Sequence, residues 1–201
     1  MSNTLLIFIK NPILGRVKSR LAVDIGEEKA LAVYRDLLQK TRKEAEQLKG
    51  VRCRLYYSDF IDENDEWSDE FFEKRLQSNG DLGQKMHGAF RESMNEKTVI
   101  IGSDCFDLTN RHIEAAFQKL DESDVVLGPA NDGGYYLLGM TNYFSQLFEG
   151  IEWSTNAVLK QTIRQAKSLN LKITFLAELV DLDTISDLEE SGYQLNYKKY
   201  R

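Results

Sequence analysis

Short apolar runs rich in β-forming residues alternate along this chain with longer segments whose apolar residues recur every three or four positions. Continuous apolar runs are typical of strands buried on both faces, as in a parallel sheet, and the wider spacing is typical of amphipathic helices. The strand segments are 4–9, 51–57, a short one around Leu76, 98–101, 124–127, 135–140 and 172–179. The helix segments are 27–49, 82–94, 110–120 and 156–170. This alternation predicts an α/β fold with a mixed, mostly parallel sheet flanked by helices, in a single domain over residues 1–201.

The apolar runs are too short to cross a membrane. The chain is 42% hydrophobic and 29% charged, and its longest N-terminal apolar run covers only residues 5–9, whereas a membrane-spanning helix needs about 20 residues. No basic stretch precedes that run, as one does in a secretory signal. The two cysteines, Cys53 and Cys105, form no disulfide framework and no CxxC pair. We therefore expect a cytoplasmic protein with no membrane partner.

The charged residues are unevenly distributed along the chain. Residues 1–23 contain four bases and no acid, a local charge of +4 in a chain whose net charge is −6. The remaining residues hold 22 bases against 32 acids. Such an acidic body lacks the broad basic face that binds nucleic acid, so we expect no nucleic-acid partner. A small basic cluster suits a small polyanion instead.

That basic cluster follows the first predicted strand. In open α/β sheets, ligands bind outside the carboxyl ends of the strands, so this position favours a binding loop. Its cations repel one another and are stabilised when a di- or triphosphate lies between them. The residues predicted to bind nucleotide phosphates are Lys10, Gly15, Lys18 and Arg20. The alternative is a solvated basic loop, and the segment lacks the P-loop motif.

A second candidate loop follows strand segment 98–101 and carries two carboxylates, Asp104 and Asp107. Two carboxylates at a strand end can hold Mg²⁺ or Mn²⁺, which would then be shared with the nucleotide, and we predict a catalytic role for Asp104. Asp107 has a competing interpretation, because it lies two residues before the predicted N-cap Thr109, where the helix dipole also favours a carboxylate. We interpret Cys105 as a buried small residue, since no neighbouring His or Lys would lower its pKa.

A third candidate loop contains the consecutive residues Asp132, Gly133 and Gly134. The glycines permit close approach of a sugar or acceptor, and Asp132 offers a hydrogen-bond acceptor or a catalytic base. A plain hairpin turn is the alternative, because an Asp-Gly step often marks one.

Two smaller segments carry further carboxylates. Asp81 precedes a predicted helix, so it either caps that helix or, with Gly83, presents backbone N–H groups to the nucleotide. Asp181 and Asp183 follow the last predicted strand and therefore lie at the same edge of the sheet, in a pattern that also indicates a helix start.

Six motifs occur in order: K-N-P-x-x-G-x-V-K-S-R-L, G-D-L-G-x-K-M, G-S-D-x-x-D-L-T, G-P-A-x-D-G-G-Y-Y-L-L-G, W-S-T and D-L-D-T. Together they resemble the transferases associated with radical-SAM and selenoprotein gene clusters, which are similar to nucleotide-diphospho-sugar transferases of the GT-A fold. The resemblance runs from about residue 5 to residue 188. The V-K-S-R-L segment also resembles phospholactate guanylyltransferases, and G-S-D resembles the segment of molybdopterin-cofactor guanylyltransferases that carries their metal aspartate.

This resemblance implies a GT-A-like, Rossmann-like fold and a set of roles. It implies that Lys10, Lys18 and Arg20 lie near the nucleotide phosphates and that Asp104 binds the metal. It further implies that Asp81, Asp132 and Gly133 surround the sugar or acceptor. The family usually has proline where this chain has Phe106, in the loop that carries Asp104.

The leading hypothesis is a glycosyltransferase-like enzyme that uses a nucleotide-diphosphate sugar, a small-molecule acceptor, and Mg²⁺ or Mn²⁺. An alternative is a nucleotidyltransferase that joins a nucleoside triphosphate to a phosphorylated small molecule, because the same scaffold serves both reactions. A third reading, motivated by Phe106, is a non-catalytic nucleotide-binding protein. No residue pattern indicates the oligomeric state.

Overall fold

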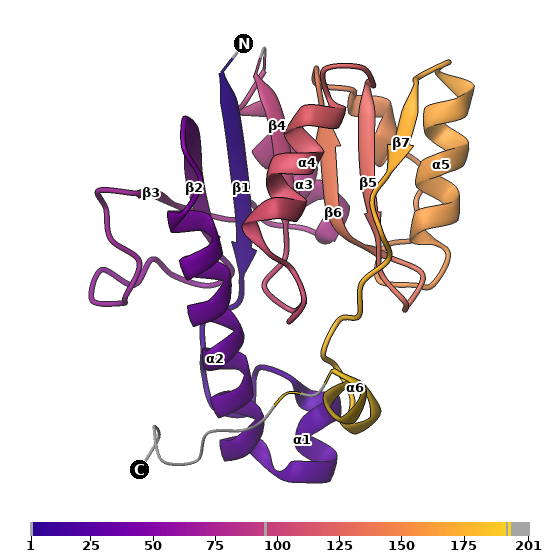
Figure 1. Cartoon of the computed structure of the whole chain (residues 1–201). Coiled ribbons are helices and arrows are strands. Elements are labelled where there is room, and N and C mark those ends of the chain that lie inside the picture. The colour runs from indigo at the N-terminus through magenta and orange to yellow at the C-terminus, as the bar shows by residue number, and fades with distance from the viewer. Residues whose placement is uncertain (1, 95, 192, 194–201) are drawn as a thin grey trace.

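A seven-stranded sheet forms the centre of the computed structural model, which describes residues 2–94, 96–191 and 193 (Figure 1). The strands are β1 (Asn3–Ile9), β2 (Val51–Tyr57), β3 (Phe72–Leu76), β4 (Lys97–Ile101), β5 (Val125–Pro129), β6 (Tyr135–Met140) and β7 (Ile173–Phe175). Their order in the sheet is β3-β2-β1-β4-β6-β5-β7. All neighbouring strands are parallel except that β6 runs antiparallel to both β4 and β5. The predicted fold class, α/β with a mixed, mostly parallel sheet, is confirmed.

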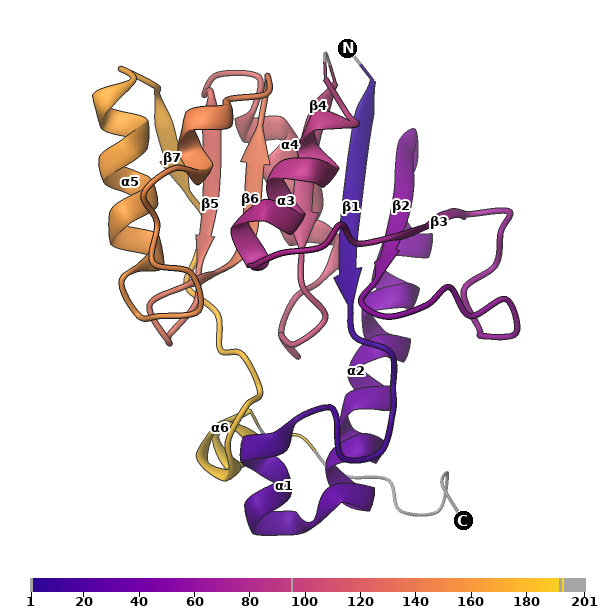
Figure 2. The same cartoon turned by 180° about the vertical axis from the view of Figure 1, so that it is seen from behind.

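Helices cover both faces of the sheet. Helices α2 (Glu27–Glu46) and α4 (Asn110–Lys119) pack on one face, and α3 (Leu82–Arg91) and α5 (Val158–Ser168) on the other (Figures 1 and 2). Successive side chains of a strand point to opposite faces, so Leu5 of β1 joins the α2–α4 layer and Leu6 joins the α3–α5 layer. Burial on both sides explains why β1 is apolar at nearly every position.

Two short helices lie beyond the carboxyl end of β1, away from the sheet: α1 (Ser19–Ile25) and α6 (Ile185–Glu190) (Figure 1). A separate small core joins them to α2, with Leu21 of α1 and Leu182 both fully buried. A short 3-10 helix, Ser145–Phe148, follows β6. None of the described helices is long and apolar enough to cross a membrane.

Several elements differ from the sequence predictions. The basic segment, predicted as a loop, contains the start of α1, whose one buried residue, Leu21, packs in a small core with Val33 and Leu37 of α2 and with Leu182. Strand β7 covers only three residues rather than 172–179. The chain after it still follows β5 loosely, with the Leu179 N–H donating to the Pro129 carbonyl at 3.1 Å, before it turns to α6. The helices also end earlier than predicted, and α5 begins at Val158 with no side-chain cap.

Candidate functional site

The loops after β1 and β4 meet because these strands are parallel neighbours. There the Lys18 ammonium contacts two carboxylates: its Nζ lies 2.5 Å from Asp104 Oδ1 and 3.0 Å from Asp183 Oδ1. The side chain of Lys18 is 3% exposed, whereas those of Asp104 and Asp183 are 44% and 45% exposed. A buried cation therefore lies beneath two carboxylates that solvent can reach.

The backbone conformation of Lys18 helps to place it there. Lys18 is the N-cap residue of α1 and has φ 48° and ψ 43°, in the left-handed region that residues other than glycine seldom adopt. Burial alone would lower the pKa of Lys18, but Asp104 and Asp183 more than offset this effect, and the pKa is raised above its usual value. Lys18 is therefore a permanent cation at neutral pH.

Asp183 and Asp181 reach the site through a direct contact between two distant segments. The Leu182 N–H donates to the Asp104 carbonyl at 2.9 Å, and Asp181 forms an isolated antiparallel bridge with Cys105. Burial first, and then the negative charges of Asp104 and Asp132, raise the pKa of Asp181 to about 7, although Lys18 opposes the shift. The position of this Asp-Leu-Asp segment after the last predicted strand indicates the correct edge of the sheet, but no local pattern indicates its contact with Lys18.

We call Asp104, Asp181 and Asp183, which lie around Lys18, the carboxylate cluster. The other predicted phosphate-binding residues form no ion pair or side-chain hydrogen bond with this cluster among the described residues. The side chains of Lys10 and Arg20 make no ion pair with any described residue, and both residues are exposed. Gly15 has φ 75°, and an added Cβ would lie 3.3 Å from the Glu27 carboxylate, so the turn favours glycine. The structure thus brings Lys18 together with Asp104 and leaves Lys10 and Arg20 facing solvent.

The loop with Asp132 is a hairpin between β5 and β6. The Gly134 N–H donates to Asp132 Oδ1 at 2.8 Å, as in an Asx turn. Gly133 has φ 88°, and a Cβ there would lie 2.3 Å from the Asn156 carbonyl oxygen. The hairpin alternative therefore describes the local structure. The Asp181 N–H donates to Asn131 Oδ1 at 3.4 Å, so this hairpin lies beside the segment of Asp181.

Asp81 and Gly83 belong to the start of α3. Asp81 Oδ1 accepts from the Gln84 N–H at 2.8 Å, and the Asp81 N–H donates to Gln84 Oε1 at 3.0 Å, which makes a capping box. A Cβ on Gly83 would lie 2.0 Å from Nε1 of Trp153, so close packing requires glycine there. These contacts give both residues structural roles, and their contact with a nucleotide stays a prediction.

In the loop after β4, Asp104 lies between the buried residues Ser103 and Cys105. Burial, followed by the charge of Asp181, raises the pKa of Cys105 to about 12, in agreement with its interpretation as an unreactive thiol. Phe106 packs edge-on against Tyr193 at 5.4 Å between ring centroids, and the Lys40 ammonium lies 5.7 Å from the Phe106 ring centre. Phe106 thus anchors the loop by packing, whereas Asp107 is exposed.

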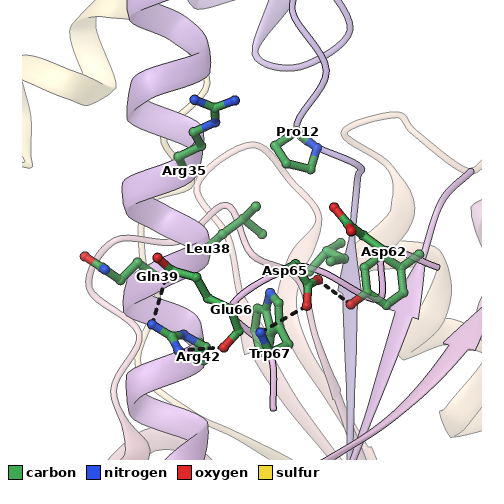
Figure 3. Close-up of a pocket in the computed structure, with 11 residues that line it drawn as sticks. Pro12, Arg35, Leu38, Gln39, Arg42, Asp62, Asp65, Glu66 and Trp67 are labelled. Carbon is green, nitrogen blue, oxygen red and sulfur yellow. Dashed lines mark hydrogen bonds and ion pairs between the residues drawn. The ribbon is translucent and has the colours of Figure 1, made fainter. Parts of the chain in front are cut away.

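A cavity of about 240 Å³ lies between α2 and the acidic segment after β2, apart from Lys18 and its aspartates (Figure 3). Arg42 of α2 donates to Glu66 Oε2 at 2.8 Å and holds that segment against the helix. The apolar part of the lining is made by Ile9, Pro12, Leu38, Tyr57 and Trp67. Neither Lys18 nor any of the clustered aspartates lines this cavity, so it is distinct from the carboxylate cluster.

Fold and site together define an α/β protein whose charged loops gather at the carboxyl ends of parallel strands, the usual ligand position in such sheets. The chain belongs to the family described as "Uncharacterized protein conserved in bacteria (DUF2064)", whose model matches residues 41–155. It is 31% identical over 128 residues to 2-phospho-L-lactate guanylyltransferase from Methanocaldococcus sp. (strain FS406-22), covering 59% of this chain. The match spans only 54% of that relative's length.

Solved structures extend the comparison to the whole chain. A protein from Desulfovibrio desulfuricans G20, assigned as a nucleotide-diphospho-sugar transferase, is 27% identical with a TM-score of 0.86, covering 100% of this chain and 91% of that one. The inositol-1-phosphate CTP transferase of T. maritima shares the fold at 13% identity, with a TM-score of 0.54 over 99% of this chain and 94% of that one. A Mycobacterium tuberculosis protein in complex with manganese shares it at 11% identity, with a TM-score of 0.58 over 94% of this chain and 97% of that one. The Methanocaldococcus and Desulfovibrio desulfuricans proteins support an enzyme of the transferase class, and the other two structures support the GT-A-like fold alone.

Proposed function

We propose that this protein is a nucleotidyltransferase, which transfers the nucleoside monophosphate part of a nucleoside triphosphate to a phosphorylated small molecule. The observation that carries this proposal is the buried Lys18 ammonium held by Asp104 and Asp183 where the β1 and β4 loops meet. The guanylyltransferase relative supports the same reaction and suggests a phosphorylated organic acid as acceptor. Association with radical-SAM or selenoprotein gene clusters stays a prediction from the sequence motifs.

The reaction needs charge stabilisation more than proton transfer. An oxygen of the acceptor phosphate attacks the α-phosphorus, the bond from that phosphorus to the β-phosphate oxygen breaks, and pyrophosphate leaves with the electron pair. The attacking oxygen is already ionised, so the reaction requires no catalytic base. Cations at Lys10, Lys18 and Arg20 would stabilise the charge that develops on pyrophosphate.

The donor set also fits Mg²⁺ or Mn²⁺. Among the residues that the structure describes, no group of three or more His, Cys, Asp or Glu side chains is arranged to hold a metal ion. Mg²⁺, however, commonly binds through one or two carboxylates plus substrate phosphates, and Asp104 and Asp183 offer two partly exposed carboxylates. When bound, the metal would neutralise charge on the phosphates. The manganese complex of the M. tuberculosis protein supports this choice of ion.

Pyrophosphate release tests the proposal. The protein is incubated with GTP, CTP, UTP, dTTP or ATP, with Mg²⁺ or Mn²⁺, and with phosphorylated acids that include 2-phospholactate. We expect release with one nucleotide, dependent on both the metal and the acceptor. Tight nucleotide binding without turnover of any pair would instead favour the non-catalytic reading.

Glycosyl transfer is the second candidate, favoured by the similarity over the full chain to the protein assigned as a nucleotide-diphospho-sugar transferase. In that reaction Asp132 would activate an acceptor hydroxyl, because its neighbour Asn131 contacts Asp181 and the hairpin therefore lies beside the charged site. Gly133 and Gly134 would allow the sugar to approach. Hydrolysis of UDP- or GDP-sugars to free sugar and nucleoside diphosphate, with no pyrophosphate release from triphosphates, would establish this candidate over the first.

A further inference from the structure

One tyrosine connects the two loops that form the site. Tyr34 lies on α2, which contributes none of the site's charged groups, and it is 1% exposed. Its hydroxyl accepts from the Lys10 N–H at 2.8 Å and lies 3.0 Å from the Lys10 carbonyl oxygen. It also lies 3.2 Å from Ser103 Oγ, and Ser103 directly precedes Asp104. The same oxygen therefore contacts the first residue after β1 and the loop after β4.

The three contacts match the hydrogen-bonding capacity of a phenol. A tyrosine hydroxyl has one hydrogen to donate and can accept through its oxygen. It donates to the Lys10 carbonyl, accepts from the Lys10 N–H, and accepts from the Ser103 hydroxyl, so every group is satisfied. Burial and then the negative charge of Asp104 raise the pKa of Tyr34, so it keeps its proton at physiological pH.

On the β1 side the contact fixes main chain, and on the β4 side it holds a buried serine hydroxyl. Lys10 begins the basic loop, and both its N–H and its C=O are held by Tyr34. Ser103 is 2% exposed, so its hydroxyl has no solvent to replace this partner. Loss of the hydroxyl would leave polar groups of both loops without this partner.

We propose that Tyr34 is a positioning residue, whose hydroxyl sets the basic loop against the Asp104 loop so that both contact the same nucleotide phosphates. The inference rests on the proposed function, because the shared ligand is a nucleotide. Tyr34 itself needs no contact with that ligand.

The test uses Tyr34→Phe, which keeps the buried ring and removes only the hydroxyl. The matched control is Tyr56→Phe: Tyr56 is 2% exposed, packs in the opposite layer, and donates to Glu92 Oε2 at 2.9 Å. The probes are GTP and the nucleotide found active in the pyrophosphate assay, each with Mn²⁺. Hydrogen exchange of segments 10–18 and 102–109 is measured without nucleotide.

For Tyr34→Phe we expect faster exchange in both segments and a loss of nucleotide affinity or kcat of roughly 10- to 100-fold. Tyr56→Phe should lower Tm without either effect. Ser103→Ala should have a smaller effect, and combining it with Tyr34→Phe should add little, because both remove the same contact. Wild-type affinity and kcat in Tyr34→Phe would overturn the inference, whereas a wild-type protein that binds no nucleotide would overturn the proposed function itself.

Discussion

Two aspartates only three residues apart have quite different surroundings. Asp104 contacts the buried Lys18 ammonium, whereas Asp107 is exposed near the start of α4. Their spacing predicts a pair of metal ligands, but it cannot distinguish them, because the difference depends on Lys18 and Asp183 from distant segments. The sequence therefore indicates Asp104 as a candidate metal ligand but does not indicate that Asp183 contacts the same Lys18 ammonium.

Substitution of each aspartate by asparagine separates the two roles. We expect Asp104→Asn to lower the metal-dependent pyrophosphate release by roughly 100-fold, since it removes a carboxylate that would bind the metal ion at the phosphates. We expect a much smaller loss for Asp107→Asn, because the exposed Asp107 carboxylate is not one of the two that contact Lys18. Glu122→Gln, an exposed substitution beyond α4, serves as control. Unchanged metal dependence in Asp104→Asn would contradict the assignment of Asp104 as metal ligand.

Most strands and helices could be predicted because their signals are local. The continuous apolar run of β1 and the periodic residues of α2 each reflect burial against the sheet. Helix α1 has no such signal, because only one of its residues, Leu21, is buried, in a small core with Val33 and Leu37 of α2 and with Leu182. The sequence likewise does not indicate that β6 is antiparallel, since the apolar pattern of a buried strand is the same in either direction.

Leu21 of α1 and Leu182 share a small core, and Leu182 is adjacent to Asp183. We therefore expect the packing of this core to affect the contact between Asp183 and Lys18. Leu182 is 0% exposed and lies between Asp181 and Asp183. We expect Leu182→Ala to cost about 2–5 kcal/mol of the free energy of unfolding and to displace Asp183 from Lys18. Nucleotide affinity should then fall along with Tm. Val23→Ala, at an α1 position that is 85% exposed, should change neither quantity. Full nucleotide affinity in a destabilised Leu182→Ala variant would show that Asp183 is dispensable.

At the scale of the whole molecule, the charged groups of the candidate site come from distant parts of the chain and meet at one edge of the sheet. The N-terminal segment supplies the cation Lys18, and three distant loops supply Asp104, Asp132 and Asp181. The net charge of −6 excludes a broad basic surface but does not indicate this convergence, which depends on the parallel β1–β4 pairing and on the contact of segment 181–183 with the loop after β4. Carboxylates gathered in this way repel one another, and the cost falls on the most buried of them, Asp181.

That repulsion predicts how stability depends on pH. The pKa of Asp181 is raised from 3.8 in a free aspartate to about 7 in the folded protein, by burial and then by Asp104 and Asp132. Between about pH 4 and pH 7 the folded state therefore binds more protons at this residue than the unfolded state, so this contribution to stability falls as pH rises. Asp181→Asn removes the titrating group, and we expect its Tm to exceed that of the wild type increasingly from pH 5 to about pH 7 and by a constant amount above the folded pKa. Thermal unfolding across that range measures the difference, with Asp121→Asn, at an exposed residue outside the cluster, as control. A Tm difference that stays constant with pH would mean that Asp181 is already ionised in the folded protein, with Lys18 alone sufficient to hold the cluster together.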